Sequence, residues 1–225
     1  MVRHLTSSSS CSILDDDLTV WRFPLVDPRE VHLLGAPLST GPGMDRILEK
    51  RCLELERMIG RLELLASQDA LLILRTAFGS SRLMNVLRSS PCAEHQLLVK
   101  FDDLLRSGVS KVTNCAIDDI AWIQASLPIN DGGLGIRSVV VLAPSAFLAS
   151  AAATYVLQSA ILGSDWPFPD HHVPHITQLW CSNYMATPPE GDLVMKQRNL
   201  TAPRSREGNR CWHRWLTLPH IGHVY

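Results

Sequence analysis

The sequence lacks the cysteine spacing and the leader that mark secreted proteins. Its 6 cysteines are widely scattered, and no C-x-x-C pair occurs among them. Residues 1–10 hold charge and serines where a signal peptide would have an apolar segment. We therefore predict reduced, mostly buried thiols in an intracellular protein of the nucleus or cytoplasm, not a secreted one.

The sequence also has little net charge and few catalytic motifs. A formal net charge of -1 excludes nucleic-acid binding through overall charge, so any such surface has to be a local patch. There is no glycine-rich phosphate loop with its lysine, no serine nucleophile elbow, and no cysteine–histidine pair with an orienting group. The sequence therefore offers no catalytic motif of these three classes.

Carboxylates and histidines occur in groups that suggest metal ligands. The groups are Asp15-Asp16-Asp17, Phe101-Asp102-Asp103, Asp118-Asp119, His171-His172-x-x-His175, and Cys211-x-His213 with His220 and His223. A polymerase palm clamps two Mg²⁺ ions with two carboxylates on a hairpin turn and a third on an upstream strand. Helical spacing instead predicts that Phe101 faces inward and that Asp102 and Asp103 face solvent. The histidine groups match no closed zinc site, so we predict no metal site.

Most of the chain predicts helices. Apolar residues recur at alternating steps of four and three from Met44 to Ala66, and Pro42 suits a first helical turn. Shorter helices are predicted from Ser67 (as the cap) to Phe78, from Ser81 to Ser89, from Ser90-Pro91 to Gly108, from Asn114 to Ala125, and from Ile176 to Met185. The predicted fold class is mainly α, a bundle of short helices with irregular termini.

Residues 122–162 combine a turn with a long uncharged run. Pro128 should end the helix that carries Trp122, and Asn130-Asp131-Gly132-Gly133 tolerates positive φ. The run that follows is long enough to span a membrane, but it is rich in alanine and interrupted by polar residues. We predict a buried core helix and no membrane span. Its i, i+4 stripe of Ser145, Ala149 and Ala153 offers a surface for self-association.

Three parts of the chain differ in composition. Residues 1–30 contain a serine run and prolines and predict a poorly structured segment. Residues 31–163 predict the helical domain, opened by a short strand at 31–38. Residues 164–225 predict a proline- and histidine-rich loop and a basic, partly disordered tail. Trp212 and Trp215 lie among arginines in that tail, where they could stack on bases or pack on the body.

Charge is segregated on the helix predicted from Met44 to Ala66. At about 100° per residue, four cations fall within a sector roughly 60° wide. These cations are Arg46, Lys50, Arg57 and Arg61. The pattern is typical of a face that follows a phosphate backbone, and equally of a solvated face that keeps a helix soluble.

Several motifs occur together in a particular order. They are Leu33-Leu34-Gly35-Ala36-Pro37-Leu38, Met44-Asp45, Ser90-Pro91-Cys92, Lys100-Phe101-Asp102-Asp103-Leu104-Leu105, Trp122…Leu127-Pro128…Gly132-Gly133-Leu134-Gly135-Ile136-Arg137-Ser138, and Leu142 to Ala152. In this order they resemble the C-terminal part of non-LTR (LINE-type) retrotransposon reverse transcriptases, the thumb and the helical segment after the palm. The resemblance covers about Leu33 to Leu162.

The resemblance implies a thumb-like helical body that holds template–primer nucleic acid, RNA or an RNA/DNA duplex. It carries over no catalytic residue, because the family's Tyr/Phe-x-Asp-Asp hairpin and upstream aspartate are not found in the right places. It also implies no cofactor here, since Mg²⁺ would belong to the missing palm. The basic stripe of the helix suits such contacts, which would be to phosphates and independent of sequence.

Three interpretations follow from these observations. The chain is a truncated reverse-transcriptase thumb region without polymerase activity of its own, a nucleic-acid-binding module in its own right, or a helical protein–protein interaction module. The last would use the small-residue stripe at Ser145, Ala149 and Ala153.

Overall fold

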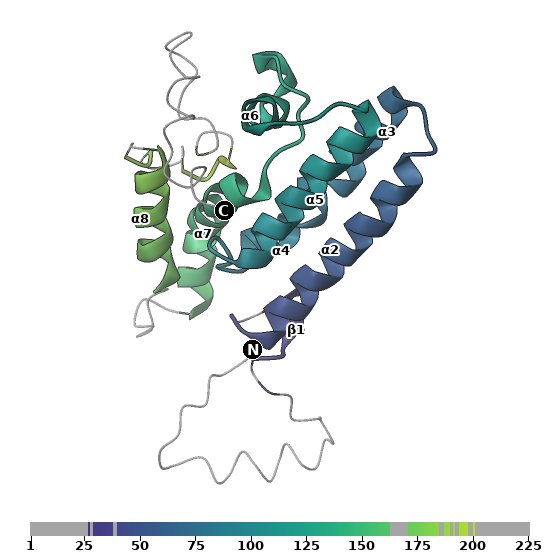
Figure 1. Ribbon diagram of the computed structural model, residues 1–225. Coiled ribbons are helices and arrows are strands. Elements are labelled where there is room, and N and C mark those ends of the chain that lie inside the picture. The colour runs from purple at the N-terminus through teal and green to yellow at the C-terminus, as the bar shows by residue number, and fades with distance from the viewer. Residues whose placement is uncertain are drawn as a thin grey trace.

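The computed structural model describes residues 27, 29–37, 40–162, 171–184, 187–189, 191, 194–197 and 200. Nearly all of the predicted irregular segment 1–30 and most of the predicted tail 164–225 lie outside these residues, as do Asp15-Asp16-Asp17, Trp212 and Trp215. In the part of the chain that is described, the fold is mainly α (Figure 1).

A short hairpin, with two residues in each strand, precedes the helices. Strands β1 (His32–Leu33) and β2 (Ala36–Pro37) pair antiparallel, with His32 opposite Pro37. The helices that follow are α2 (Pro42–Leu62), α3 (Ser67–Ile73), α4 (Met84–Ser89), α5 (Gln96–Thr113), α6 (Asp119–Ser126), α7 (Val139–Leu162) and α8 (His172–Tyr184). A π-helical turn at Leu74–Phe78 and a 3-10 turn at Ser80–Arg82 join α3 to α4.

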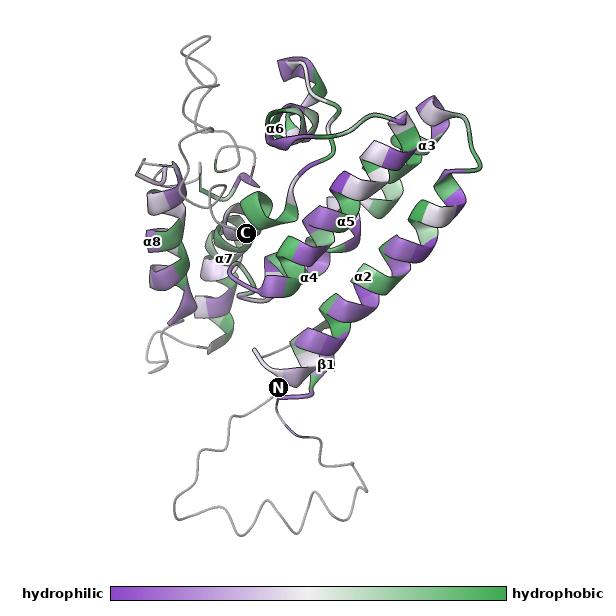
Figure 2. Ribbon diagram, in the orientation of Figure 1, coloured by the Kyte–Doolittle hydropathy of each residue, from purple (hydrophilic) through white to green (hydrophobic). Residues whose placement is uncertain are grey.

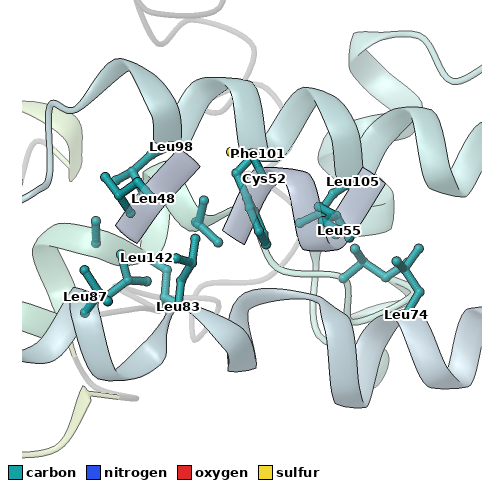
Figure 3. Packing of buried hydrophobic residues seen from close by; sticks show 14 of the residues in the cluster. Leu48, Cys52, Leu55, Leu74, Leu83, Leu87, Leu98, Phe101, Leu105 and Leu142 are labelled. Atoms are coloured by element: carbon teal, nitrogen blue, oxygen red, sulfur yellow. The ribbon is translucent and has the colours of Figure 1, made fainter. Parts of the chain in front are cut away.

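Helices α2 and α5 form the main packing pair. Pro42 opens α2 in its first turn, as predicted, whereas the helix ends at Leu62, before the predicted Ala66. The apolar repeat of α2 is buried, and α5 packs against it. Figure 3 shows the apolar side chains of the two helices meeting in one core, completed by residues of α4 and α7. That core includes Leu48, Cys52, Leu55, Leu98, Phe101, Leu105, Leu87 and Leu142.

The predicted bounds of α5 are wrong at both ends. The helix begins at Gln96, not at Ser90-Pro91, because the Nδ1 atom of His95 accepts the backbone N–H of Leu97 and caps it. Gly108 does not end the helix. It lies inside α5, where the lack of a side chain makes room for Ile59 of α2. The helix instead ends at Thr113, and its C-cap residue Asn114 adopts the left-handed conformation at φ 53°.

Two further predicted helix starts are corrected. Ser67 is the first residue of α3 and makes no side-chain capping bond. Helix α6 begins at Asp119, not at Asn114, because the Asp118 carboxylate accepts the N–H of Ala121 at 2.7 Å. The predicted stop before Pro128 is confirmed, since α6 ends at Ser126.

Helix α7 lies at the centre of the described structure and contacts α4, α5 and α8. Its first half is buried, as predicted, but its second half is not, and Tyr155, Val156, Leu157 and Ile161 are exposed. By length and composition alone, residues 139–161 could cross a membrane, although half of the most apolar window is buried inside the protein.

Helix α8 packs on α7 through a second, smaller apolar cluster. Trp180 and Ile176 of α8 lie against Phe147, Leu148 and Ala149 of α7. The predicted start of this helix at Ile176 is four residues late, since α8 begins at His172.

Candidate nucleic-acid interface

The four cations predicted to form a face on α2 are all exposed. The buried stripe of α2 faces α5, and the hydrophilic residues lie on the side turned away from it (Figure 2). Helix α2 therefore presents Arg46, Lys50, Arg57 and Arg61 to solvent along one side. This follows directly from the three- and four-residue spacing of its apolar positions.

The face divides into two parts with different surroundings. Arg46 forms an ion pair with Glu30, and its Nε atom donates to the carbonyl of Pro42 at 3.3 Å. Glu30 thus offsets the charge of Arg46 at the N-terminal end. Within the described residues, no carboxylate lies within ion-pair distance of Lys50, Arg57 or Arg61.

Arg57 and Arg61 also line a cavity of about 300 Å³ beside α2. Two further arginines, Arg51 of α2 and Arg82 of the 3-10 turn, line the same cavity. Its remaining lining residues are Glu54, Leu55, Met58, Phe78 and Phe101. Among the described residues, four guanidinium groups thus share one cavity with a single carboxylate.

The two additional arginines are held in place by neighbouring groups. The Nη1 atom of Arg51 donates to Glu54 at 2.7 Å. The guanidinium of Arg82 lies 5.0 Å from the centre of the Phe78 ring, and its Nε atom donates to the carbonyl of Ala77 at 3.1 Å. Stacking and hydrogen bonding thus restrict the orientation of Arg82.

The sequence pattern alone does not single out Arg51 or Arg82. Arg51 lies about 80° beyond the edge of the cationic sector on α2. Arg82 is far from α2 in the sequence and reaches the cavity only because the π-helical and 3-10 turns fold back beside that helix. No spacing rule in the sequence brings these arginines together.

The acidic pair at Asp102-Asp103 is not the solvent-facing pair that helical spacing predicts. Phe101 is buried as expected, and Asp103 is exposed, but Asp102 is also buried. Its carboxylate accepts the N–H of Val139 at 2.8 Å and of Val140 at 3.2 Å, which caps the start of α7. Burial raises the pKa of Asp102 to about 6, against the opposing effect of these hydrogen bonds.

The other acidic pair is occupied by structural contacts as well. Asp118 caps α6, and Asp119 accepts a hydrogen bond from Arg106 at 2.7 Å. Across the described residues, no group of three or more His, Cys, Asp or Glu side chains could hold a metal ion. Cys211, His213, His220 and His223 lie outside the described residues.

A second cavity, of about 240 Å³, brings histidines near the start of α2. The Nε2 atom of His95 lies 2.8 Å from Asp45, while its Nδ1 atom accepts the Leu97 N–H. Both ring nitrogens of His95 are therefore occupied. Burial raises the pKa of the neighbouring Cys92 thiol to about 12, so that thiol is a poor nucleophile and a poor ligand.

The small-residue stripe on α7 is mostly covered within the chain. Ser145 is buried and donates to the carbonyl of Leu200 at 3.2 Å, and Ala149 is buried beside α8. Ala153 is exposed. Self-association through the stripe therefore stays a prediction, with Ala153 as its accessible member.

Comparison of this chain with protein-family models, with curated proteins and with solved structures found no match.

Proposed function

We propose that the chain is a thumb-like part of a non-LTR retrotransposon reverse transcriptase. In this proposal α2 holds RNA or an RNA/DNA duplex through its sugar–phosphate backbone. The mainly α architecture and the ordered motifs between Leu33 and Leu162 support this origin. The tight turn after α6 supports it too, because the Gly-Gly-Leu-Gly motif is part of the resemblance.

The observation that carries the binding role is a series of three exposed cations on α2, none of which has an ion-pair partner in the described part of the chain. Lys50, Arg57 and Arg61 extend roughly 16 Å along the helix axis, enough to meet more than one phosphate of a strand. Backbone contacts of this kind hold a duplex without reading its sequence. A thumb needs this property, because it has to hold whatever template is being copied.

No polymerase activity is proposed for these residues alone. Asp102 and Asp118 cap helices, and Asp119 pairs with Arg106, so these carboxylates already have structural partners. The catalytic Mg²⁺ ions would be held by a palm, and no cofactor is proposed here.

Binding of a fluorescent RNA/DNA hybrid, measured by anisotropy from about 50 to about 200 mM salt, tests the proposal. We expect affinity to fall steeply with salt, and Arg57→Glu to weaken binding about tenfold and to reduce the salt slope by at least about 1. Arg88→Glu on α4 is the matched control, because it changes the net charge equally at an exposed position away from α2. Salt-insensitive binding, or equal losses in both variants, would overturn the proposal.

A second candidate is a helical protein–protein interaction module. The exposed apolar side chains on the second half of α7 favour it, since so much exposed apolar surface on one helix is a common feature of protein-interaction sites. These side chains are Tyr155, Val156, Leu157 and Ile161.

A further inference from the structure

We infer that the four-arginine cavity beside α2 is a binding site for one phosphate group of the bound nucleic-acid strand. The inference rests on the proposed function for the source of the phosphate. It adds Arg51 and Arg82 to the binding residues. It also assigns Arg57 and Arg61 to a defined pocket, in place of a diffuse charged face.

Charge is the first argument for a phosphate. Arg51, Arg57, Arg61 and Arg82 line the cavity, and Glu54 is the one carboxylate among its described lining residues. Glu54 is hydrogen-bonded to Arg51, so it offsets one positive charge and leaves three. Such a surplus inside a recess attracts a dianion or a phosphodiester far more strongly than a flat surface does.

An unsatisfied donor is the second argument. The Nε atom of Arg51 is buried and has no hydrogen-bond partner among the described residues. Buried polar groups nearly always have a partner, and an exception calls for a missing ligand or water. Arg51 lines the cavity, so a small rotation of its side chain toward a bound phosphate oxygen would supply that partner. The planar guanidinium of arginine matches phosphate oxygens well.

Preorganisation is the third argument. The Phe78 ring and the Ala77 carbonyl hold the guanidinium of Arg82 at the cavity, as described above. These contacts use the ring-facing surface and the Nε atom, and no described carboxylate forms an ion pair with Arg82. Its terminal nitrogens are thus ready to donate with little further loss of side-chain freedom.

Continuity with the exposed face indicates the source of the phosphate. Arg57 and Arg61 belong both to the cation series on α2 and to the cavity lining. A strand that follows the series from Lys50 would therefore pass the mouth of the cavity. The volume of about 300 Å³ is ample for a phosphate with accompanying water.

The test combines hybrid binding with arginine side-chain NMR on the full chain. With wild type, we expect the hybrid to shift the Nε resonance of Arg51 in a saturable way. We expect Arg82→Gln to weaken hybrid binding about fivefold to tenfold and to lower the salt slope by about 1. Arg88→Gln, which removes the same charge from α4, should change neither quantity. Arg82 is exposed, so this substitution leaves the core intact, and an unchanged melting temperature confirms that.

The outcomes separate this inference from the proposed function. One outcome is that Arg57→Glu weakens binding, Arg82→Gln does not, and the Arg51 resonance does not move. In that case the proposed function is supported and the phosphate-binding site in the cavity is wrong. If the hybrid does not bind at all, the proposed function fails. Pyrophosphate is then the probe. A saturable shift of the Arg51 Nε resonance supports a binding site for a free phosphate in the cavity, and the absence of a shift overturns that site.

Discussion

The Oδ1 atom of Asp102 accepts a hydrogen bond from the backbone N–H of Val139 at 2.8 Å. This contact joins the middle of α5 to the first residue of α7. The same carboxylate accepts the Val140 N–H and, at 2.5 Å, the hydroxyl of Ser138. One buried side chain thus satisfies two of the free N–H groups at the start of α7 and fixes where that helix begins.

The burial of Asp102 predicts a pH-dependent stability. The folded protein keeps the Asp102 proton up to a pH near 6, whereas the unfolded chain releases it near its ordinary pKa of 3.8. The Asp102 contribution to the free energy of unfolding should therefore fall as pH rises through this window, by roughly 3 kcal/mol in total. Chemical denaturation at pH 4 and pH 7 measures the change.

Asp102→Asn removes the titrating group and should lack this contribution, while Asp103→Asn, at the exposed neighbour, should keep it. The NMR titration of the Asp102 carboxyl carbon provides an independent check. A pKa below 4 for that carbon would show that the hydrogen bonds outweigh burial and would contradict the prediction.

In the Gly-Gly-Leu-Gly turn, we expect alanine substitutions at Gly132 and Gly133 to lower the stability of the protein by different amounts. A Cβ atom at Gly133 would lie 2.1 Å from the carbonyl oxygen of Leu127, so the backbone would have to move. We expect Gly133→Ala to destabilise the protein by about 3 kcal/mol or more. Gly132 has φ +82° but open space around it, so Gly132→Ala should cost only about 1 kcal/mol. Equal losses in urea denaturation would count against the close approach at Gly133.

The two glycines inside the main helix pair also predict opposite outcomes. A Cβ at Gly108 of α5 would come within 3.0 Å of Ile59, so Gly108→Val should destabilise by roughly 1–3 kcal/mol. Gly60 of α2 has nothing within 4 Å of its Cβ position. Gly60→Ala should therefore stabilise the helix by up to about 1 kcal/mol. Thermal unfolding of both variants tests the packing, and a neutral Gly108→Val would show that α2 and α5 are not closely packed there.

The exposed end of α7 predicts self-association if the second candidate function is correct. Val156→Lys combined with Ile161→Lys should then weaken the dimer about tenfold or more, because it places charge in an apolar contact. Ser159→Lys adds charge at an exposed position that is already polar, and it should have a smaller effect. Sedimentation velocity at micromolar concentrations measures the association. A wild-type chain that is monomeric throughout would contradict self-association and count against the interaction module.

The sequence was sufficient to predict the mainly α fold and the orientation of its longest amphipathic helix. The apolar spacing from Met44 to Leu62 places one face of α2 in the core, and the same periodicity exposes Arg46, Lys50, Arg57 and Arg61. Pro42 and Pro128 mark a helix start and a helix end by fixing local backbone angles. These properties depend on neighbours along the chain, which the sequence states directly.

Tertiary structure decided the features that depend on distant residues. Gly108 continues α5 because the side chain of Ile59 occupies the space beside it, although a glycine alone predicts a helix end. Asp102 is buried because the unsatisfied N–H groups of α7 lie where its carboxylate can accept them. Arg51 and Arg82 share a cavity because the turns after α3 fold back beside α2. Long-range packing governs each case, and local periodicity contains no information about it.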